Sequence, residues 1–130
     1  MALTPEQIAT LGRLLEERRQ ALIAETLDDY ARAREESFAQ VAGTVRDSGD
    51  EAQADLLADL GQAEVVREVA TIRDLEAAQA RIAAGTYGIC SECGADIGFE
   101  RLQAYPTALR CQPCQHTYEK THVQRGGARL

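Results

Sequence analysis

The arrangement of its four cysteines constrains this chain more than any other feature. The pattern is Cys-x2-Cys-x17-Cys-x2-Cys, formed by Cys90, Cys93, Cys111 and Cys114, and the chain has no other cysteine. Each pair has the spacing of a tight knuckle that aims two sulfur atoms at one point, and the spacer is long enough to bring both knuckles together. Four thiolates at about 2.3 Å are the donor set of a tetrahedral Zn²⁺ ion. The sequence therefore predicts one structural zinc ion bound by these four residues.

Two other uses of paired cysteines fit this sequence less well. No secretory signal opens the chain, and cytosolic thiols stay reduced, which argues against a disulfide pair. A redox Cys-x-x-Cys motif needs a βαβ context, which the sequence does not show. We therefore expect reduced cysteines and a cytoplasmic protein.

Composition favours long helices over a large globular core. The chain has 130 residues, only 5% of them aromatic, and no Trp. Ala, Leu, Glu and Arg, all good helix formers, dominate its first two thirds. The longest apolar runs are far shorter than the roughly 20 residues of a bilayer span, so no membrane contact is expected.

A first long helix is predicted over residues 5–42. Thr4 can cap its start, Pro5 suits the first helical position, and Gln7 can complete a capping box. Apolar residues recur mostly three, four or seven positions apart on one side of this helix: Ile8, Leu11, Leu15, Leu22, Tyr30, Phe38 and Val41. Residues 43–50 form the predicted tip that follows it.

A second long helix is predicted over residues 50–84, with Asp47 or Ser48 as its cap and Gly85 as its end. Its apolar stripe consists of Leu57, Leu60, Val65, Val69, Ile72, Leu75 and Ile82. Gly61 is its weak point, because glycine costs up to ~1 kcal/mol relative to alanine inside a helix. A bend or break is expected there if anywhere.

The fold class is therefore mostly α. Because the connection is short, residues 1–84 are predicted to form a long antiparallel two-helix coiled-coil hairpin, each helix about 50 Å long at 1.5 Å per residue. Residues 85–123 are predicted to form a small four-cysteine zinc finger with a short C-terminal helix, in which Tyr87 and Tyr105 pack. Residues 124–130 are predicted to be a flexible tail.

The charge is unevenly distributed. The formal net charge is −7, and the stretch from Asp47 to Glu64 contains six acidic residues and no Lys or Arg. Nucleic-acid binding requires a basic face, which this chain does not show, so specific DNA binding is not expected. A basic protein surface is the favoured partner.

The residues around the cysteines extend the pattern. They read Thr86-Tyr87-Gly88-Ile89-Cys90-Ser91-Glu92-Cys93-Gly94, then Ile97-Gly98, Arg101-Leu102, Ala104, Pro106-Thr107 and Cys111-x-x-Cys114. Between the predicted helices the chain reads Asp47-Ser48-Gly49-Asp50-Glu51-Ala52. The first pattern resembles the zinc finger of the DksA/TraR family, and the second resembles the Asp-x-x-Asp-x-Ala tip of its DksA-type members.

This resemblance implies a transcription regulator and not an enzyme. Such proteins bind bacterial RNA polymerase, insert the hairpin into its secondary channel, and rest the zinc module on the channel rim. The tip then approaches the active centre and alters the stability of promoter complexes. The resemblance implies Asp50 as the principal tip contact, Asp47 as the second, and Ala52 as a small residue that permits close approach. Both aspartates also suit a helix N-terminus. We expect a monomer.

Many DksA-type members respond to guanosine tetraphosphate through basic residues. The corresponding positions here are Asp74, Tyr105 and Gln115, and none is basic. The resemblance therefore implies a weak or absent response to this nucleotide.

Two other functional classes stay open. A zinc-ribbon nucleic-acid-binding module would bind DNA or RNA in a salt-sensitive way, and a coiled-coil scaffold would form a stable dimer whose function ignores the tip. No nucleophile–base constellation or phosphate-cradling loop is present, so the sequence does not predict an enzyme. His116 and His122 follow a complete thiolate set and are expected to be exposed polar residues.

Overall fold

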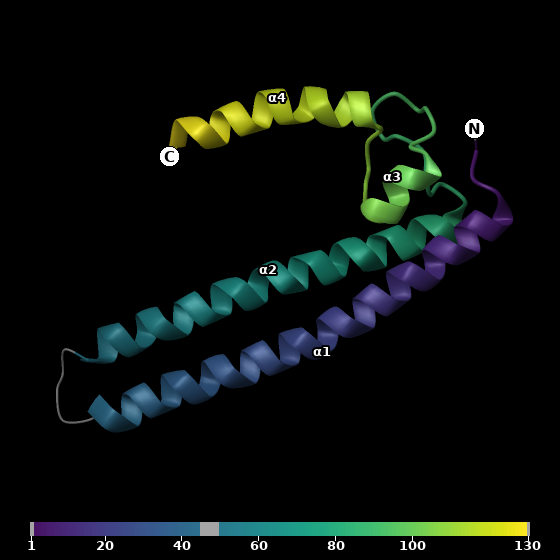
Figure 1. The fold of residues 1–130 in the computed structure, drawn as a ribbon. Coiled ribbons are helices and arrows are strands. Elements are labelled where there is room, and N and C mark those ends of the chain that lie inside the picture. The colour runs from purple at the N-terminus through teal and green to yellow at the C-terminus, as the bar shows by residue number, and fades with distance from the viewer. Residues whose placement is uncertain (1, 45–49, 130) are drawn as a thin grey trace. The chain divides into compact units, whose positions relative to one another are not determined.

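The structure is a computed structural model that describes residues 2–44 and 50–129. Within that range the side chains of residues 37, 38, 40–62 and 123–129 are not described. The described residues form four helices, namely α1 (Pro5–Thr44), α2 (Asp50–Ala84), α3 (Phe99–Ala104) and α4 (Gln112–Arg129) (Figure 1). Their β-structure is limited to an isolated antiparallel bridge between Ile89 and Asp96. The predicted mostly helical fold class is confirmed.

Helix α1 begins with the predicted capping box. The backbone N–H of Gln7 donates to Oγ1 of Thr4 at 3.1 Å, and the backbone N–H of Thr4 donates to Oε1 of Gln7 at 3.0 Å. These bonds satisfy donors that a helix start would otherwise leave unpaired. Helix α2 runs through Gly61 without interruption.

Helix α2 ends at a glycine in the left-handed conformation. Gly85 has φ 77°, its N–H donates to the Ile82 carbonyl at 3.2 Å, and the N–H of Thr86 donates to the Arg81 carbonyl at 3.0 Å. This pair of bonds is a Schellman cap, which closes the last helical turn. The cap turns the chain out of the helix directly before the cysteine-bearing segment.

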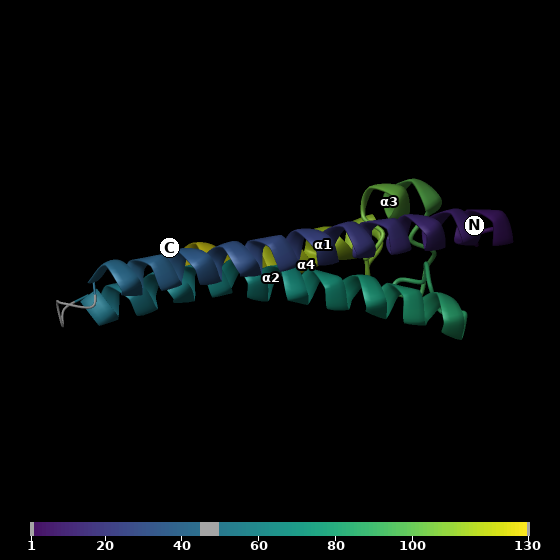
Figure 2. The same ribbon diagram turned by 90° about the horizontal axis from the view of Figure 1, so that it is seen from below.

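The chain forms two compact units. The first comprises Met1–Glu16 and Leu75–Leu130. In it, the start of α1 and the end of α2 lie side by side (Figures 1 and 2) and bury Leu11, Leu15, Leu75 and Ala78. Nε2 of Gln79 donates to the Glu16 carboxylate, which fixes an antiparallel register.

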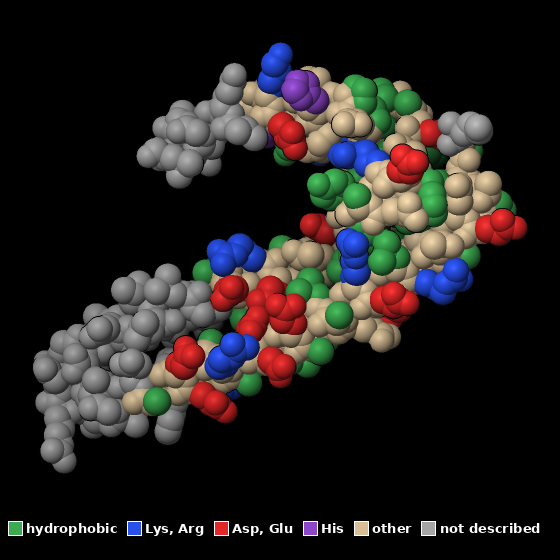
Figure 3. Space-filling model, in the orientation of Figure 1, with side chains coloured by type: hydrophobic (Ala, Val, Ile, Leu, Met, Phe, Trp, Pro, Cys, Tyr) green, Lys and Arg blue, Asp and Glu red, His purple; other side chains and the backbone are tan. Residues whose placement is uncertain are grey.

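The second unit, Glu17–Asp74, contains the remainder of α1 and α2. Thr26 is 8% exposed; its hydroxyl donates to the Leu22 carbonyl and lies 2.7 Å from Oε2 of Glu68 on the opposite helix. Acidic side chains gather on the face of this unit that Figure 3 shows. Asp29, Glu36 and Glu64 line a shallow groove of about 160 Å³ there.

Helix α4 extends beyond the predicted closing helix. It begins directly after Cys111, whose carbonyl accepts the N–H of Gln115 at 2.9 Å, and continues to Arg129. Residues 124–129 therefore lie in a helix where the sequence predicts a flexible tail, and the flexibility of that tail stays a prediction. None of the helices, over the part of the chain that is described, is long and apolar enough to span a bilayer.

Gly85 and Gly88 provide a matched test of how closely Leu3 packs against residue 88. Gly85 and Gly88 both have positive φ, 77° and 85°, but a Cβ at Gly88 would lie 2.8 Å from Cδ1 of Leu3, whereas one at Gly85 would meet nothing within 4 Å. Both substitutions to alanine should cost about 1–2 kcal/mol for the left-handed backbone. Gly88→Ala should destabilise the zinc-loaded protein further, because Leu3 must move. Urea denaturation measures both, and equal losses would show that Leu3 yields freely.

Candidate functional site

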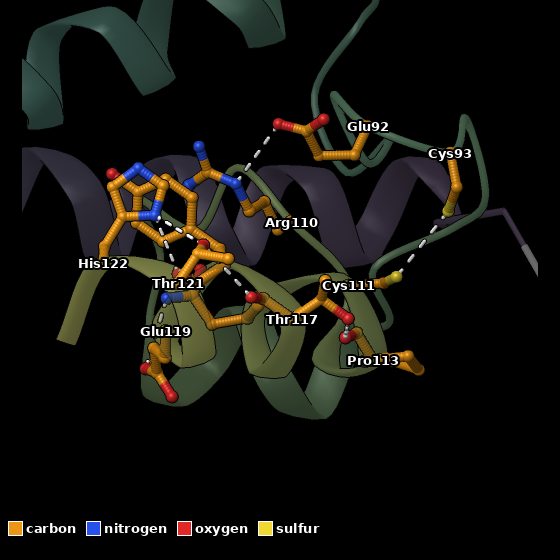
Figure 4. Close-up of polar contacts among 11 residues, drawn as sticks. Glu92, Cys93, Arg110, Cys111, Pro113, Thr117, Glu119, Thr121 and His122 are labelled. Carbon is orange, nitrogen blue, oxygen red and sulfur yellow. Dashed lines mark hydrogen bonds and ion pairs between the residues drawn. The ribbon is translucent and has the colours of Figure 1, made fainter. Parts of the chain in front are cut away.

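The four cysteines converge from two parts of the chain. Cys90 and Cys93 lie between α2 and α3, Cys111 lies directly before α4, and Cys114 lies in its first turn. Their sulfur atoms all lie within 4.8 Å of one another. Sγ of Cys93 points toward Sγ of Cys111 at 3.7 Å (Figure 4). Sulfurs of a tetrahedral zinc site at 2.3 Å are about 3.8 Å apart, so the residues fit the ion.

The same distance excludes a disulfide between Cys93 and Cys111. A sulfur–sulfur bond is about 2.05 Å long, and all four cysteines are free in the structure. The prediction of reduced cysteines therefore agrees with the geometry of the site.

The backbone explains why the first knuckle forms. The N–H of Gly94 donates to the Cys90 carbonyl at 3.0 Å, and the N–H of Cys90 donates to the Ala95 carbonyl at 2.7 Å. Gly94 has φ 75°, a conformation that residues with a Cβ rarely adopt. The turn therefore closes at this glycine and leaves both sulfurs on the same side.

The apolar core beside the cysteines is small. Tyr87, Ile97 and Leu102 are buried, and the Tyr87 hydroxyl donates to the Pro106 carbonyl at 2.8 Å. Tyr105, for which the sequence predicts packing, is instead 63% exposed, because its ring lies on the outer side of α3 beside the Arg101 guanidinium. So few buried side chains cannot fold this segment alone, whereas zinc binding in small sites supplies roughly 10–16 kcal/mol.

The cysteine thiols show why a cation is needed. The backbone N–H groups of Cys111 and Cys93 lower the pKa of Cys90 to about 6. Neighbouring thiols act oppositely at Cys114, where Cys111 and then Cys93 raise the pKa to about 12. One thiolate forms readily at neutral pH, but four cannot coexist so close together without a compensating positive charge. Zinc supplies that charge when it is bound.

The tip residues lie largely outside what the structure describes. Asp47 is outside the described residues. Asp50 is the first residue of α2 and Ala52 the third, but their side chains are not described. Their contacts therefore stay predictions.

Two of the three positions considered for the nucleotide response lie together. Tyr105 and Gln115 line a groove of about 460 Å³ between α3 and α4 in the first unit, and Asp74 belongs to the second unit. Arg101, His116 and Glu119 line the same groove. His122 is exposed and stacks on Tyr118 of α4.

Sequence reasoning missed the contacts of Arg110. Its guanidinium lies over the Tyr118 ring, 3.7 Å from Cζ to the ring centroid, and near the Glu92 carboxylate. The available signal was its position directly before Cys111, between the two knuckles.

Comparison with known proteins gives the same architecture. Residues 85–120 match the prokaryotic dksA/traR C4-type zinc finger family. The solved structure of transcription factor DksA2 from Pseudomonas aeruginosa superposes with a TM-score of 0.75 at 27% identity, covering 92% of this chain and 88% of that one. The fold and the site thus define a helical hairpin joined to a zinc finger that holds one structural zinc ion.

Curated relatives agree with this class. The RNA polymerase-binding transcription factor DksA of Escherichia coli K12 is 34% identical over 61 residues, which is 47% of this chain and 40% of that protein. The Bacillus subtilis protein YteA is 32% identical over 117 residues, which is 82% of this chain and 46% of that protein. The chain spans less than half the length of these relatives. Residues 85–120 thus match the dksA/traR C4-type zinc finger, and the chain as a whole is similar to DksA proteins in sequence and fold.

Zinc binding should release protons. The pKa of Cys114 is about 12, and the Ala95 N–H lowers the pKa of Cys93, but the thiols of Cys90 and Cys111 outweigh this effect and raise it. Both are protonated at pH 7.5 but bind zinc as thiolates. Calorimetric titration of zinc into the metal-free protein should therefore give heats that depend on the ionisation enthalpy of the buffer. Cys114→Ser should bind more weakly and release fewer protons, and buffer-independent heats would contradict this picture.

The buried Tyr87 should make the first unit sensitive to alkali. Burial raises the pKa of Tyr87 to about 12, although the Arg81 charge opposes this shift. Because the folded pKa exceeds the ordinary value of 10, the stabilisation is complete below pH 10 and is lost between pH 10 and 12. Tyr87→Phe should cost about 0.5–1.5 kcal/mol at pH 7 but flatten this alkaline loss. Thermal melts across pH would test it, and parallel curves would contradict it.

Proposed function

We propose that this protein is a transcription regulator that binds bacterial RNA polymerase. The observation that carries this proposal is the likeness to DksA2 over 92% of the chain, which includes the hairpin as well as the finger. The name of the E. coli relative states that it binds RNA polymerase, and its match supports the same partner here. A bacterial cytoplasmic setting and action as a monomer belong to this proposal.

In the proposed mechanism, the hairpin enters the secondary channel of the polymerase and the zinc finger rests on the rim. Helix α2 alone has 35 residues, about 50 Å at 1.5 Å per residue, which is long enough to reach into a deep channel. Insertion presents Asp47 and Asp50 to the active centre. Carboxylates there can pair with basic polymerase side chains or approach a Mg²⁺ ion, which prefers oxygen ligands.

Charge supports a basic protein partner over DNA. The net charge is −7, and Asp29, Glu36 and Glu64 line one groove of the second unit together with a single Arg32, which pairs with Asp29 at 2.7 Å. An acidic surface repels the phosphate backbone but is attracted to a positively charged channel wall. The protein thus acts on promoter complexes through the polymerase, without specific DNA contacts and without catalysis of its own.

We further propose a weak or absent response to guanosine tetraphosphate. In the groove that contains Tyr105 and Gln115, the positive charge of Arg101 is matched by the negative charge of Glu119. Arg101 also donates its Nε–H to the Arg110 carbonyl at 3.0 Å, which limits its freedom to reorient. A nearly neutral groove offers a highly charged anion little electrostatic gain.

Substitution of the tip residue Asp50 should lower the regulatory activity far more than the affinity for polymerase. Wild-type protein should alter the open-complex lifetime and transcript yield at a ribosomal RNA promoter with purified polymerase. Asp50→Asn should reduce this effect roughly tenfold because a charged contact is lost at the active centre, yet change polymerase affinity only about threefold or less, since exposed ion pairs are weak.

The neighbouring acid supplies the matched control. Glu51→Gln removes the same charge one position away and should retain activity. Added guanosine tetraphosphate should change the wild-type effect by about twofold at most, because the groove lacks net positive charge. A wild-type protein without effect on the promoter complex, or an equal loss in Asp50→Asn and Glu51→Gln, would overturn the proposed tip mechanism.

A further inference from the structure

Arg110 lies at the centre of a stack that joins the zinc finger to α4. Its guanidinium carbon is 3.7 Å from the centroid of the Tyr118 ring, and Tyr118 stacks on His122 with centroids 3.7 Å apart and planes inclined by 16°. Figure 4 shows the Arg110 and His122 side chains beside α4, with the Glu92 carboxylate pointing toward the Arg110 guanidinium. Three planar groups thus form one column along the helix.

The carboxylate that pairs with Arg110 belongs to the first knuckle. Its side chain is 19% exposed, and its Nε is buried without a hydrogen bond among the described residues. The nearest described acid is Glu92, whose Oε1 lies 3.4 Å away and which stands between Cys90 and Cys93. A partly buried guanidinium gains from this carboxylate and from the aromatic face, which together offset the loss of water. The Arg110 side chain is therefore well placed only when Glu92 is held nearby.

The backbone around Arg110 makes the same connections. The Leu109 carbonyl accepts the N–H of Ser91 at 2.8 Å, which ties this segment to the first knuckle. The Arg110 carbonyl accepts Nε–H of Arg101 on α3. The Cys111 carbonyl accepts the N–H of Gln115 in the first turn of α4. Residues 109–111 therefore contact one knuckle, α3 and α4, and they include the zinc ligand Cys111.

We propose that Arg110 couples zinc binding to the stability of the first turns of α4. When zinc holds the two knuckles together, Glu92 and Arg110 are brought into register, and the guanidinium stacks on Tyr118. When zinc leaves, Glu92 and Cys111 separate, the guanidinium loses its carboxylate, and the column on α4 disperses. Zinc thereby stabilises turns of α4 that follow Cys114, its last ligand in the chain. This coupling does not depend on the partner of the protein.

The test is hydrogen–deuterium exchange of the α4 amides at residues 116–122 in the full-length protein, with zinc content measured for every sample. Removing zinc from the wild type should raise their exchange rate about tenfold. Zinc-loaded Arg110→Ala should show a rise of roughly five- to tenfold, no larger than zinc removal causes and within the range expected for a partly desolvated cation–π contact. Arg110→Lys should recover only part of the protection, because an ammonium group lacks the planar stack. Arg13→Ala, an exposed arginine of the same unit, should change nothing.

Coupling is distinguished from plain stabilisation in the metal-free state. There Arg110→Ala and wild type should exchange alike, because the stack is already lost. If Arg110→Ala accelerates α4 exchange equally with and without zinc, or if zinc removal leaves wild-type α4 unaffected, the proposal fails. Should Arg110→Ala not retain zinc, Tyr118→Leu decides the question, since it removes the aromatic face away from the knuckles. Wild-type exchange rates in zinc-loaded Tyr118→Leu would overturn the proposal.

Discussion

The zinc–thiolate interaction is the constraint on which the rest of the first unit depends. Few apolar side chains are buried beside the cysteines, with Tyr87, Ile97 and Leu102 the principal ones. Hydrophobic burial on this scale does not fold a segment of such length. The close approach of four thiols is unfavourable without a cation, as the raised pKa of Cys114 shows, so the metal both permits and requires the observed geometry.

The helical hairpin is stabilised differently in its two units. In the first, Leu11, Leu15, Leu75 and Ala78 form a continuous buried seam. In the second, the polar Thr26 is buried and faces Glu68, and acids surround it. The hydrogen bond from Thr26 lowers the pKa of Glu68, but the carboxyl of Asp29, burial and the charge of Glu25 raise it overall. Among the described side chains of α1 and α2, the buried apolar ones therefore lie in the first unit, and the second unit buries Thr26.

Local rules made much of this architecture predictable. The capping box at Thr4 and Gln7, the glycine stop at Gly85 and the cysteine spacing each depend on residues near one another in sequence, and each appears as expected. Ile89 and Leu109 are 47% and 43% exposed although apolar, which no local pattern indicates. The exposure of Tyr105 and the stacking of Arg110 on Tyr118 depend on how α3 and α4 meet, which periodicity does not encode.

Charged residues are distributed differently in the finger and in the segment from Asp47 to Glu64. Arginines lie near carboxylates in the finger: Arg110 is 3.4 Å from Glu92, and Arg101 lines the same groove as Glu119. Between Asp47 and Glu64, by contrast, no basic residue offsets the acids. Opposite charges within one segment partly cancel for an outside partner, whereas a segment whose charges share one sign keeps its attraction for a basic surface. In the sequence, the negative charge that a basic partner would recognise is therefore concentrated between Asp47 and Glu64.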